Sequence, residues 1–488
     1  MFDHFKSSTA MFALGLFLVC DVQSFAYELT VQCDQIQGSF RALHGLNGGV
    51  LIQGETVDLT RYWKAAGIPL TRLHDCEWPA PNVVDVHAIF PDFRNAADDP
   101  ESYRFAPTDD YIAAIIHSGS GIVYRLGESI EHTKRKHYVH PPKDFHKWAD
   151  ICRHAVKHYN EGWSDGFHYG IKYWEIWNEP ENKPQMWTGT DDEYFEMYLV
   201  ASKILKEEFP HLKIGGPSIG AGFVKTENGW ELSPYAQQFL RFAKNNDAPL
   251  DFYSWHTYTD QPMEYVDKAV VARKFLDEIQ FTETELHLNE WNYLPDNDWG
   301  PMLNTDDPKR REAWFERIGG AEGAGFVACV LINLQSAPVD VSNYFTNYGG
   351  FGIFAQYGAP RKTYYAMKAF NELLRSPIRL LAEGGMENTC SIAAGTNEDR
   401  SELTVLIGTL HHSEPKTTII LNSFPWEGQA EFEKYTIDAI HDFEKTDNGS
   451  ITIENRTVRL ELETPESSVI LLKFSVRACQ KFFRMQTK

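Results

Sequence analysis

The stretch "KYWEIWNEPEN", Lys172 to Asn182, joins an apolar run to a short polar motif. The run from Tyr173 to Trp177 is rich in aromatic residues and isoleucine, as buried strands of a parallel sheet are. Asn178 and Glu179 follow directly, and Pro180 then ends the strand pattern. We therefore expect a buried strand that displays a carboxylate at its carboxyl end.

Short apolar runs alternate with amphipathic stretches of helical length on both sides of this segment, from residue 40 to residue 376. This is the βα rhythm of a parallel sheet. Eight strands are expected, at Phe40–Gly48, Leu70–His74, Gly121–Leu126, Tyr173–Asn178, Lys213–Pro217, Phe252–Tyr258, Glu285–Glu290 and Gly325–Leu334. Helices are expected near 59–66, 109–119, 142–160, 191–209, 233–245, 264–280, 308–323 and 361–375. The fold class is therefore α/β, and eight such units predict a (β/α)8 TIM barrel.

A doubly wound open sheet is the alternative within this class. It requires a Gly-rich phosphate turn after its first strand. The segment "HGLNGG" at 44–49 is rich in glycine, but it lacks the G-x-G-x-x-G order and an obvious following helix. We therefore favour the barrel.

The sequence pattern changes after Leu374 to short alternating strands, such as "ELTVLIGTL" and "SSVILLKF", separated by Asn, Gly, Asp and Pro. This spacing predicts an accessory β-sandwich. We expect the barrel at 34–378, the sandwich at 379–475 and a basic tail at 476–488. A further strand at 27–33 is a candidate addition to the sandwich.

The first 26 residues have the pattern of a secretory signal. The apolar run "MFALGLFLVC" at 11–20 follows Lys6, is too short to span a membrane, and precedes a small-x-small cleavage pattern at 24–26. We expect a secreted or periplasmic protein. A lipoprotein is less expected, because Val19 stands before Cys20 where a small residue is usual. No other segment is predicted to span a membrane.

Composition narrows the class of partner. The chain has 43% hydrophobic and 14% aromatic residues, as a compact globular protein does. Its 46 Lys and Arg against 68 Asp and Glu give a net charge of −22, which repels the phosphates of nucleic acids and of anionic membranes. Neither Cys-x-x-Cys nor a cluster of histidines is present, so we expect no metal and no cofactor. After the leader, six cysteines are left, and one or two disulfides or six thiols are both open.

Polar residues that end apolar strands are the candidates for a site, because the loops after barrel strands meet on one face. The segments "TRLHD", "WEIWNEP", "SWHTY" and "LHLNEWN" end in this way. Glu179 and Glu290 each follow an asparagine at such a strand end. Two facing carboxylates are what glycoside hydrolysis requires, one as an acid with a raised pKa and one that stays ionised. Glu181, beyond the proline, is a rival acid that ranks below Glu179.

Other strand-end side chains are candidates for contacts with a sugar or with the two carboxylates. Arg72 offers the ionised carboxylate a fixed positive charge, and Tyr258 offers it a hydroxyl donor. Asn178 is placed to meet a sugar 2-hydroxyl. Three further candidates have core packing as the alternative role: His74, His256 and Trp291.

At these residues the chain resembles the clan A glycoside hydrolases, which carry Asn-Glu at the end of strand 4 and a glutamate at the end of strand 7. Within the clan it most resembles glycoside hydrolase family 39, the family of β-xylosidases and α-L-iduronidases. The likeness is carried by "TRLHD", "YWEIWNEPEN", "KIGGPS", "DFYSWHTY", "LNEWN" and "GAPRKTYYAMKAF". It implies that Glu179 is the acid/base, that Glu290 is the nucleophile, and that hydrolysis retains configuration through a covalent glycosyl-enzyme.

Two features bear on the sugar. Strand 8 in this clan commonly ends in a tryptophan of the sugar subsite, whereas the strand expected here leads into Leu334 and Gln335. An α-L-iduronidase needs basic groups for the substrate carboxylate. Arg361 and Lys362 are candidates, with ordinary solvent-facing charges as the alternative. Xylose, arabinose, glucose and a uronic acid therefore all remain open.

The sequence thus predicts a secreted retaining glycoside hydrolase that acts on a poly- or oligosaccharide. The long insertions at 76–108 and 293–307 favour exo action, because loops of this length are able to wall a pocket that is closed at one end. An endo-acting clan A polysaccharide hydrolase and a non-catalytic carbohydrate-binding barrel are the alternatives. The sequence leaves the oligomeric state and the disulfide pairing open.

Overall fold

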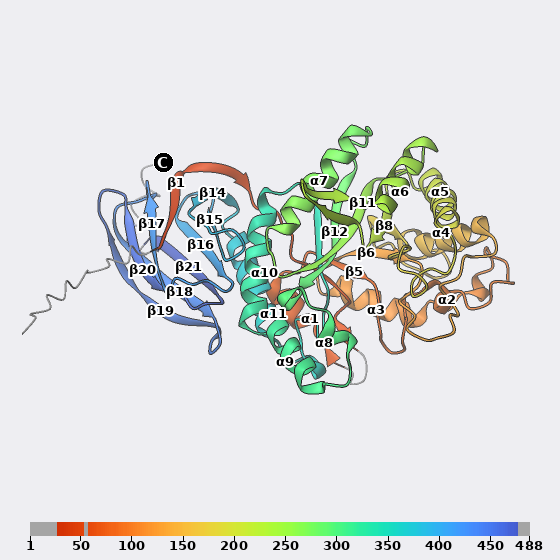
Figure 1. Ribbon diagram of the computed structural model, residues 1–488, viewed down its shortest axis with the longest axis horizontal. Helices are drawn as coiled ribbons and strands as arrows, with labels where there is room; N and C mark the ends of the chain where they lie inside the picture. The colour runs from red at the N-terminus through yellow and green to blue at the C-terminus, as the bar shows by residue number, and fades with distance from the viewer. Residues whose placement is uncertain (1–26, 53–56, 477–488) are drawn as a thin grey trace, which may run out of the picture.

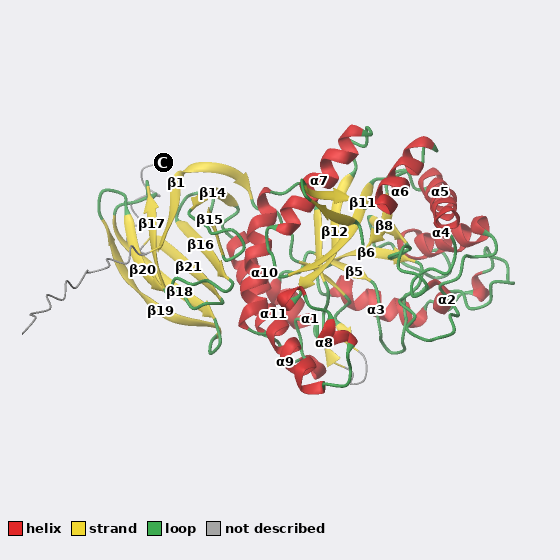
Figure 2. Cartoon of the chain, in the orientation of Figure 1, coloured by secondary structure: helices red, strands yellow, loops and turns green. Residues whose placement is uncertain are grey.

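A computed structural model describes residues 27–52 and 57–476. The predicted signal sequence at 1–26, Cys479 and almost all of the basic tail lie outside the described residues. Figure 1 shows a barrel of strands and helices beside a second, strand-rich domain, and Figure 2 shows that the second domain is built of strands alone.

The larger domain is a closed barrel of eight parallel strands, in the order β11-β12-β13-β2-β5-β6-β7-β8. Its strands are β2 (Gly45–Asn47), β5 (Leu70–Leu73), β6 (Gly121–Leu126), β7 (Tyr173–Ile176), β8 (Lys213–Ile219), β11 (Phe252–Thr259), β12 (Glu285–Tyr293) and β13 (Val341–Tyr344). The TIM-barrel prediction is therefore confirmed, and the quoted stretch forms β7 at its centre.

Helices cover the barrel, and all of the main ones except α10 lie where the amphipathic stretches predict them. The main ones are α1 (Thr60–Ala66), α3 (Ala106–His117), α4 (Phe145–Glu161), α5 (Asp191–Glu208), α6 (Pro234–Asn245), α7 (Glu264–Glu278), α9 (Pro308–Gly319), α10 (Ala321–Asn333) and α11 (Lys362–Leu374). The start of α5 follows from its sequence, because Thr190 and Glu193 form a reciprocal capping box.

Loops at the carboxyl ends of the strands hold short elements. These are α2 (Val86–Ile89), η1 (Pro100–Ser102), η2 (Pro295–Asn297), α8 (Gly300–Leu303) and η4 (Gln356–Gly358), with the hairpins β3 (Leu51–Ile52)–β4 (Val57–Asp58) and β9 (Phe223–Thr226)–β10 (Gly229–Leu232). The insertion at 76–108 contains α2 and η1, and the insertion at 293–307 contains η2 and α8.

The expected eighth strand at Gly325–Leu334 is wrong, because this run belongs to α10 and to the short helix η3 (Leu334–Ser336). Residues 323–332 are all buried, since the barrel covers one side of α10 and the second domain covers the other. A helix that is apolar all round lacks the periodicity that separates it from a buried strand. The eighth strand is β13, which has only four residues.

The second domain is a nine-stranded sheet in the order β19-β18-β21-β16-β15-β14-β1-β17-β20. Its strands are β1 (Tyr27–Ser39), β14 (Ile378–Glu383), β15 (Cys390–Thr396), β16 (Glu402–Thr409), β17 (Lys416–Asn422), β18 (Gly428–Ile437), β19 (Asp442–Ile453), β20 (Val458–Glu463) and β21 (Ser468–Val476). β1 lies between β14 and β17, so the first described strand is part of the C-terminal domain and extends beyond the expected 27–33.

This sheet has a separate core of its own and also packs against the barrel. Leu406 and Leu471 join the large core of the barrel, whereas their strand neighbours Val405 and Leu472 belong to the second core. Successive side chains of β16 and β21 point to opposite faces of the sheet, so they are divided between the two cores. In Figure 1, α10 and α11 stand between the sheet and the barrel strands.

Five cysteines lie in the described part of the chain, and each is a buried free thiol: Cys33, Cys76, Cys152, Cys329 and Cys390. Among the described residues, no single helix is long and apolar enough to cross a membrane. The bent pair formed by Pro308–Gly319 and Ala321–Ser336 passes that test on length and composition only.

Candidate active site

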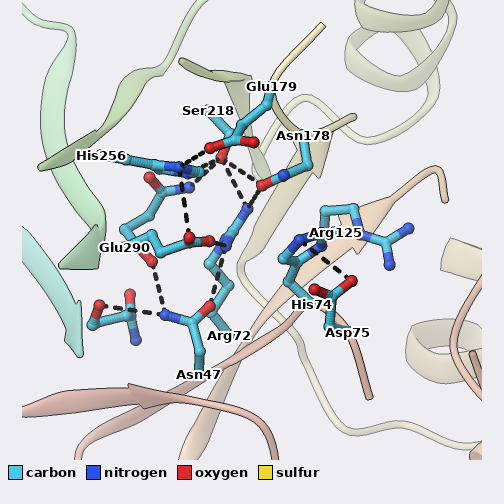
Figure 3. Close-up of polar contacts among 12 residues, drawn as sticks. Asn47, Arg72, His74, Asp75, Arg125, Asn178, Glu179, Ser218, His256 and Glu290 are labelled. Atoms are coloured by element: carbon cyan, nitrogen blue, oxygen red, sulfur yellow. Dashed lines mark hydrogen bonds and ion pairs between the residues drawn. The ribbon is translucent and has the colours of Figure 1, made fainter. Parts of the chain in front are cut away.

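Arg72, at the end of β5, is the central cation of the site and is fully buried. Its Nε donates to Oε2 of Glu175 at 2.7 Å, and its Nη1 lies 3.3 Å from Oε2 of Glu290. Nη1 also donates to Oδ1 of Asn47 at 3.0 Å. A buried guanidinium needs such partners, because an unpaired buried charge is strongly destabilising. Arg72 therefore ties three strands together and fixes one oxygen of Glu290 (Figure 3).

Two donors contact the carboxylate of Glu290. Its side chain is 9% exposed, the hydroxyl of Tyr258 donates to Oε1 at 2.6 Å, and Arg72 approaches Oε2. Burial raises the pKa of the Tyr258 hydroxyl well above its usual value, and the charge of Glu290 raises it further, so the hydroxyl stays a donor. These contacts suit a carboxylate that remains ionised and attacks a carbon atom.

Glu179 has a different environment, in which His256 is the main partner. Nδ1 of His256 lies 2.8 Å from Oε1 of Glu179 and 3.7 Å from Oε1 of Glu290, so the ring stands between the two carboxylates (Figure 3). Nδ2 of Asn182 donates to Oε2 of Glu179 at 2.9 Å. The Glu179 side chain is 17% exposed, which leaves it accessible to a substrate.

The protonation of this pair follows from its surroundings. Burial alone lowers the pKa of His256, but the charge of Glu290 and the hydrogen bond and charge of Glu179 outweigh it, so the pKa lies above its usual value. Burial alone raises the pKa of Glu179, but the hydrogen bond and charge of His256 outweigh it, so the pKa lies below its usual value. In the resting site the proton of the pair is therefore on His256.

One oxygen of Glu179, one ring nitrogen of His256 and one oxygen of Glu290 all lie within 4.8 Å of one another. A second group with the same spacing is Asp85, His87 and Glu128. In the first group the imidazole already pairs with both carboxylates. In the second, His87 pairs with Glu128, and the oxygens of Asp85 accept from Arg125 at 2.6 Å and from Ser129 at 2.8 and 2.9 Å. Because these donor atoms already have protein partners, we assign no metal to either group.

Asn178 is oriented by its own acceptor atom. Nη2 of Arg72 donates to Oδ1 of Asn178 at 2.6 Å, and the hydroxyl of Ser218 donates to the same oxygen at 3.0 Å. No hydrogen bond within the described residues engages Nδ2 of Asn178. Its amide hydrogens are therefore free to meet a ligand beside Glu179, as the predicted contact with a 2-hydroxyl requires.

His74 lies close to Arg72 and His256, and it is 4% exposed. Burial lowers the pKa of His74 well below its usual value, and the charges of Arg72 and Arg125 lower it further. Its Nε2 lies 3.4 Å from Oδ1 of Asp75. The structure therefore brings His74 to the site as a neutral ring, together with Asp75, which ends the same "TRLHD" segment.

Trp291 does not reach the site, so its prediction as a sugar contact is corrected. The side chain is fully buried, and its ring centroid lies 5.0 Å from that of Tyr344 and 5.7 Å from that of Tyr265. The physical reason is the alternation of a strand, which turns residue 291 to the opposite side from Glu290.

Aromatic side chains near Tyr258 come from two loops. The ring of Tyr258 lies 5.2 Å from that of Trp299, in the insertion at 293–307, and 6.2 Å from that of Phe351. Phe351 in turn lies 6.4 Å from Phe345, the residue that directly follows β13. Trp299 is 37% exposed. An aromatic residue does therefore follow strand 8.

The expected place of Leu334 and Gln335 at the end of strand 8 is wrong. Both belong to η3, which precedes β13, so they stand before the eighth strand and not after it. Oε1 of Gln335 accepts from the backbone N–H of Arg41 at 2.8 Å, which ties η3 to the segment before β2. The error follows from the wrong strand assignment.

Arg361 and Lys362 are engaged by the protein itself. Nη1 of Arg361 donates to the carbonyl oxygens of Gly349 at 3.2 Å and Gly350 at 2.7 Å. Nζ of Lys362 donates to Oδ1 of Asp442 at 2.7 Å, on the strand-rich domain. Both cations therefore have structural partners, and neither is available to pair with a carboxylate of a substrate.

Five residues of the network were not predicted as site residues: Asn47, Glu175, Asn182, Ser218 and Asn289. Glu175 lies in the quoted stretch, and its position four residues before Glu179 was the available signal. Ser218 follows "GGP" at the end of β8, where its hydroxyl lies 2.7 Å from Nε2 of His256. Single hydroxyl and amide residues carry no periodicity, so sequence spacing does not reveal their partners.

Several strand ends have a left-handed backbone at residues other than glycine. The φ angles are 49° at Asp75, 72° at Trp177, 44° at Glu179 and 61° at Ser218. Such conformations cost about 1–3 kcal/mol each for ordinary residues and cluster at functional sites. Their gathering at the ends of β5, β7 and β8 marks this end of the barrel as the site.

Comparison with known proteins gives a family match. The family model described as glycosyl hydrolases family 39 matches residues 82–414. A β-xylosidase of Geobacillus stearothermophilus is 29% identical over 262 residues, which are 48% of this chain and 48% of that protein. A β-xylosidase of Caldicellulosiruptor saccharolyticus is 22% identical over 315 residues, which are 58% of this chain and 56% of that protein. The chain thus matches about half the length of these relatives.

Solved structures show the same fold over nearly the whole chain. A glucosidase from Croceicoccus marinus has a TM-score of 0.77 at 24% identity, covering 93% of this chain and 99% of that one. A GH39 enzyme from Xanthomonas axonopodis pv. citri has a TM-score of 0.69 at 14% identity, covering 93% and 98%. At these identities the likeness shows the architecture of the barrel and its strand-rich partner.

Proposed function

The chain belongs to glycosyl hydrolase family 39, and from that premise we propose that it is a retaining glycoside hydrolase with Glu290 as nucleophile and Glu179 as acid/base. The observation that carries the proposal is the pair of carboxylates itself. They have oxygens within 4.8 Å of each other, and their environments differ. Retaining enzymes hold their carboxyl groups about 5–5.5 Å apart, whereas inverting enzymes need about 6.5–9.5 Å.

In the first step, an oxygen of Glu290 attacks the anomeric carbon while Glu179 gives its proton to the glycosidic oxygen. The bond from the anomeric carbon to that oxygen breaks, the alcohol leaves, and an ester joins the sugar to Glu290. In the second step, Glu179 takes a proton from water, and the water oxygen attacks the anomeric carbon. The ester breaks, which restores the carboxylate of Glu290 and the proton of Glu179.

The acid role requires the proton that His256 holds in the resting site. Transfer from Nδ1 to Oε1 across 2.8 Å converts the imidazolium–carboxylate pair into a neutral pair. A bound sugar expels water, and loss of water disfavours charged groups more than neutral ones. Substrate binding therefore favours the protonated form of Glu179 that the first step uses.

We propose a neutral sugar as the substrate, in agreement with the β-xylosidase relatives. Arg361 and Lys362, the predicted partners of a uronic acid, are bound to protein groups. Arg72 is already paired with Glu175 and Glu290. Arg72, Arg361 and Lys362 are therefore all engaged by protein groups, and none of the three is free to receive a substrate carboxylate beside Glu179 and Glu290.

We further propose exo action and secretion. The insertion at 293–307 places Trp299 against Tyr258, and the loop from residue 76 brings Cys76 and Glu77 close to Tyr348. Two loops of this kind suit a pocket that accepts a chain end. Secretion follows from the signal pattern at 1–26, and N-terminal sequencing of protein from the culture medium tests it, with Tyr27 as the expected first residue.

The decisive experiment is hydrolysis of 4-nitrophenyl β-D-xylopyranoside and 4-nitrophenyl β-D-glucopyranoside, followed by proton NMR of the first sugar released. Retention predicts that the β-anomer appears first and then mutarotates. Release of the α-anomer first contradicts the double displacement. Absence of hydrolysis across a panel that includes arabinosides and natural xylans contradicts the glycosidase proposal itself.

A further inference from the structure

Asp75 is a carboxylate at the site that the mechanism above does not use. It directly follows His74 after β5, and its side chain is 28% exposed. Oδ1 accepts from the backbone N–H of Ile130 at 3.1 Å and lies 3.4 Å from Nε2 of His74. Within the described residues no hydrogen bond engages Oδ2. One oxygen is thus fixed by the protein, and the other is left free.

The surroundings of Asp75 make its charge costly. Burial raises the pKa of Asp75 to about 7, and the nearby charges of Glu290 and Asp85 also raise it, against the hydrogen bond from Ile130 and the charge of Arg125. The backbone at Asp75 is also left-handed, with φ at 49°. A free carboxylate oxygen, like-charged neighbours and a strained backbone are all destabilising, which is the pattern of a residue kept for binding.

The position of Asp75 relative to the reacting groups defines what it meets. Glu290 and Asn178 mark where the anomeric carbon and the 2-hydroxyl lie. In Figure 3, His74 and Asp75 stand apart from Glu179, His256 and Glu290, on the other side of Arg72. A pyranose that reacts with Glu290 therefore presents its far edge, with the 3- and 4-hydroxyls, towards Asp75.

We propose that Asp75 is a specificity-determining residue that accepts a hydrogen bond from the 3- or 4-hydroxyl of the reacting sugar through Oδ2 and repels uronic acids. The inference rests on the proposed glycosidase function and names its substrate class as neutral pyranoses. Hydrogen bonds to ionised acceptors are roughly twice as strong as neutral ones. A negative charge at this edge also raises the cost of bringing a second carboxylate into the site.

The test compares Asp75→Asn with the parent protein on three probes: 4-nitrophenyl β-D-xylopyranoside and its 3-deoxy and 4-deoxy analogues. We expect the parent to lose about tenfold to a hundredfold in kcat/KM on one deoxy analogue. For the full xyloside, kcat/KM of Asp75→Asn is expected to be lower than that of the parent by a similar factor. For that deoxy analogue, kcat/KM of Asp75→Asn is expected to be little lower than its own value for the xyloside. Its kcat/KM for 4-nitrophenyl β-D-glucuronide, relative to the xyloside, rises.

Asp92→Asn is the matched control, because Asp92 is an acid of the insertion that follows Asp75 and pairs with Arg94 at the surface. We expect its kinetics to equal those of the parent. Equal discrimination between the xyloside and both deoxy analogues by Asp75→Asn and the parent overturns the proposal. Because each comparison is made within one protein, a partly unfolded variant does not imitate the expected result.

If the parent protein hydrolyses none of the aryl glycosides, this result contradicts the proposed function but does not test the role of Asp75. Calorimetric titration with methyl β-D-xylopyranoside then decides the inference. Binding that weakens at least tenfold in Asp75→Asn supports it. Binding that is unchanged by the substitution, or that is absent in the parent, overturns it.

The pH dependence of Tm distinguishes a binding role of Asp75 from a structural role. Between pH 3.8 and about 7 the folded protein holds the Asp75 proton more tightly than the unfolded chain, so this group's contribution to stability falls as pH rises. Asp75→Asn is therefore expected to have a higher Tm than the parent at pH 8 and not at pH 4. A lower Tm at pH 8 indicates a structural role instead.

The same titration predicts the KM profile. The charged and titratable groups around Asp75 are the adjacent His74, Arg125 of β6, Asp85 before α2 and Glu290 of β12. In the parent, KM for the xyloside is expected to rise as pH falls below about 7, because protonation of Asp75 weakens its acceptor oxygen. In Asp75→Asn this rise is expected to disappear.

Discussion

Glu179 and Glu290 are the same residue type, yet their neighbours assign them opposite tasks. Glu290 receives Tyr258 and Arg72 as donors, which favours its anion. Glu179 shares a proton with His256 and also accepts a hydrogen bond from the neutral amide of Asn182. The difference in partners, and not in side-chain chemistry, separates nucleophile from acid/base.

Glu290→Ala removes the attacking oxygen, so turnover of every aryl glycoside is expected to fall to background. Glu179→Ala is expected to lose about 10²–10⁴-fold in kcat on substrates with poor leaving groups and much less on 2,4-dinitrophenyl glycosides. Added azide is expected to rescue Glu179→Ala and to give a glycosyl azide of retained configuration. An azide product of inverted configuration from Glu179→Ala contradicts the assignment.

His256 predicts the alkaline limit of activity. Because the pKa of His256 is raised above its usual 6.5, the Glu179–His256 pair keeps its proton above that pH. The alkaline limb of kcat/KM is therefore expected above pH 6.5, and His256→Gln is expected to move it to lower pH. A pH–rate profile of both proteins measures the shift. An unmoved limb means that another group supplies the proton.

The strand ends are the elements that place these residues, and their geometry leaves little space. Gly220, in the turn after β8, faces the carboxylate of Glu179, and a Cβ atom there would overlap Oε1. Glu181 holds this turn by accepting from the backbone N–H of Ala221 at 2.8 Å. The turn thus limits where the acid/base carboxylate is able to lie.

Gly220→Ala is expected to displace the Glu179 carboxylate and to lower kcat about tenfold or more for poor leaving groups, since small misplacements of catalytic groups are costly. Substrates with good leaving groups are expected to be affected less. Gly449→Ala in β19, where a Cβ meets no atom within 4 Å, is the matched control. Equal losses on both classes of leaving group argue against a specific effect on the acid/base.

Seven of the eight barrel strands are predictable from the sequence because each is an apolar run that alternates with a stretch of helical length, and four of these runs end at polar residues of the site. The eighth is not, since β13 is short and carries Asn343 in its centre. α10 was mistaken for it because burial on all sides removes helical periodicity. The Glu179 and Glu290 positions follow from the same strand-end pattern. Glu175 and Ser218 do not, because their partners come from distant strands.

At the scale of the whole molecule, α10 joins the two domains into one packed unit. Gly325 on α10 lies against the carbonyl oxygen of Thr409 in β16, and a Cβ there would overlap that oxygen. Gly408 likewise lies against Ala328 and Cys329. Close backbone approach between helix and sheet therefore depends on glycine on both sides of the interface.

Gly325→Val is expected to destabilise the protein by about 1–3 kcal/mol, because overpacking forces the helix away from the sheet. Thermal unfolding measures this as a lower Tm, with Gly449→Ala as the control that leaves Tm unchanged. Since Gly325 faces the sheet of the second domain and not the strand ends that carry the site, kcat/KM at low temperature is expected to stay close to that of the parent. An unchanged Tm contradicts the close packing of α10.

The position of β1 has a consequence for biosynthesis. Among the described strands β1 is translated first, yet both neighbours with which it pairs, β14 and β17, are translated only after the entire barrel. Until then the side of α10 that packs against the sheet is exposed to solvent. A nascent chain that stalls before β14 therefore exposes an apolar helix surface and an unpaired β-strand. Synthesis of the strands from β14 onward covers both the apolar side of α10 and the edge of β1. Premature termination late in the chain is therefore expected to cause aggregation, although the missing residues are not part of the catalytic site.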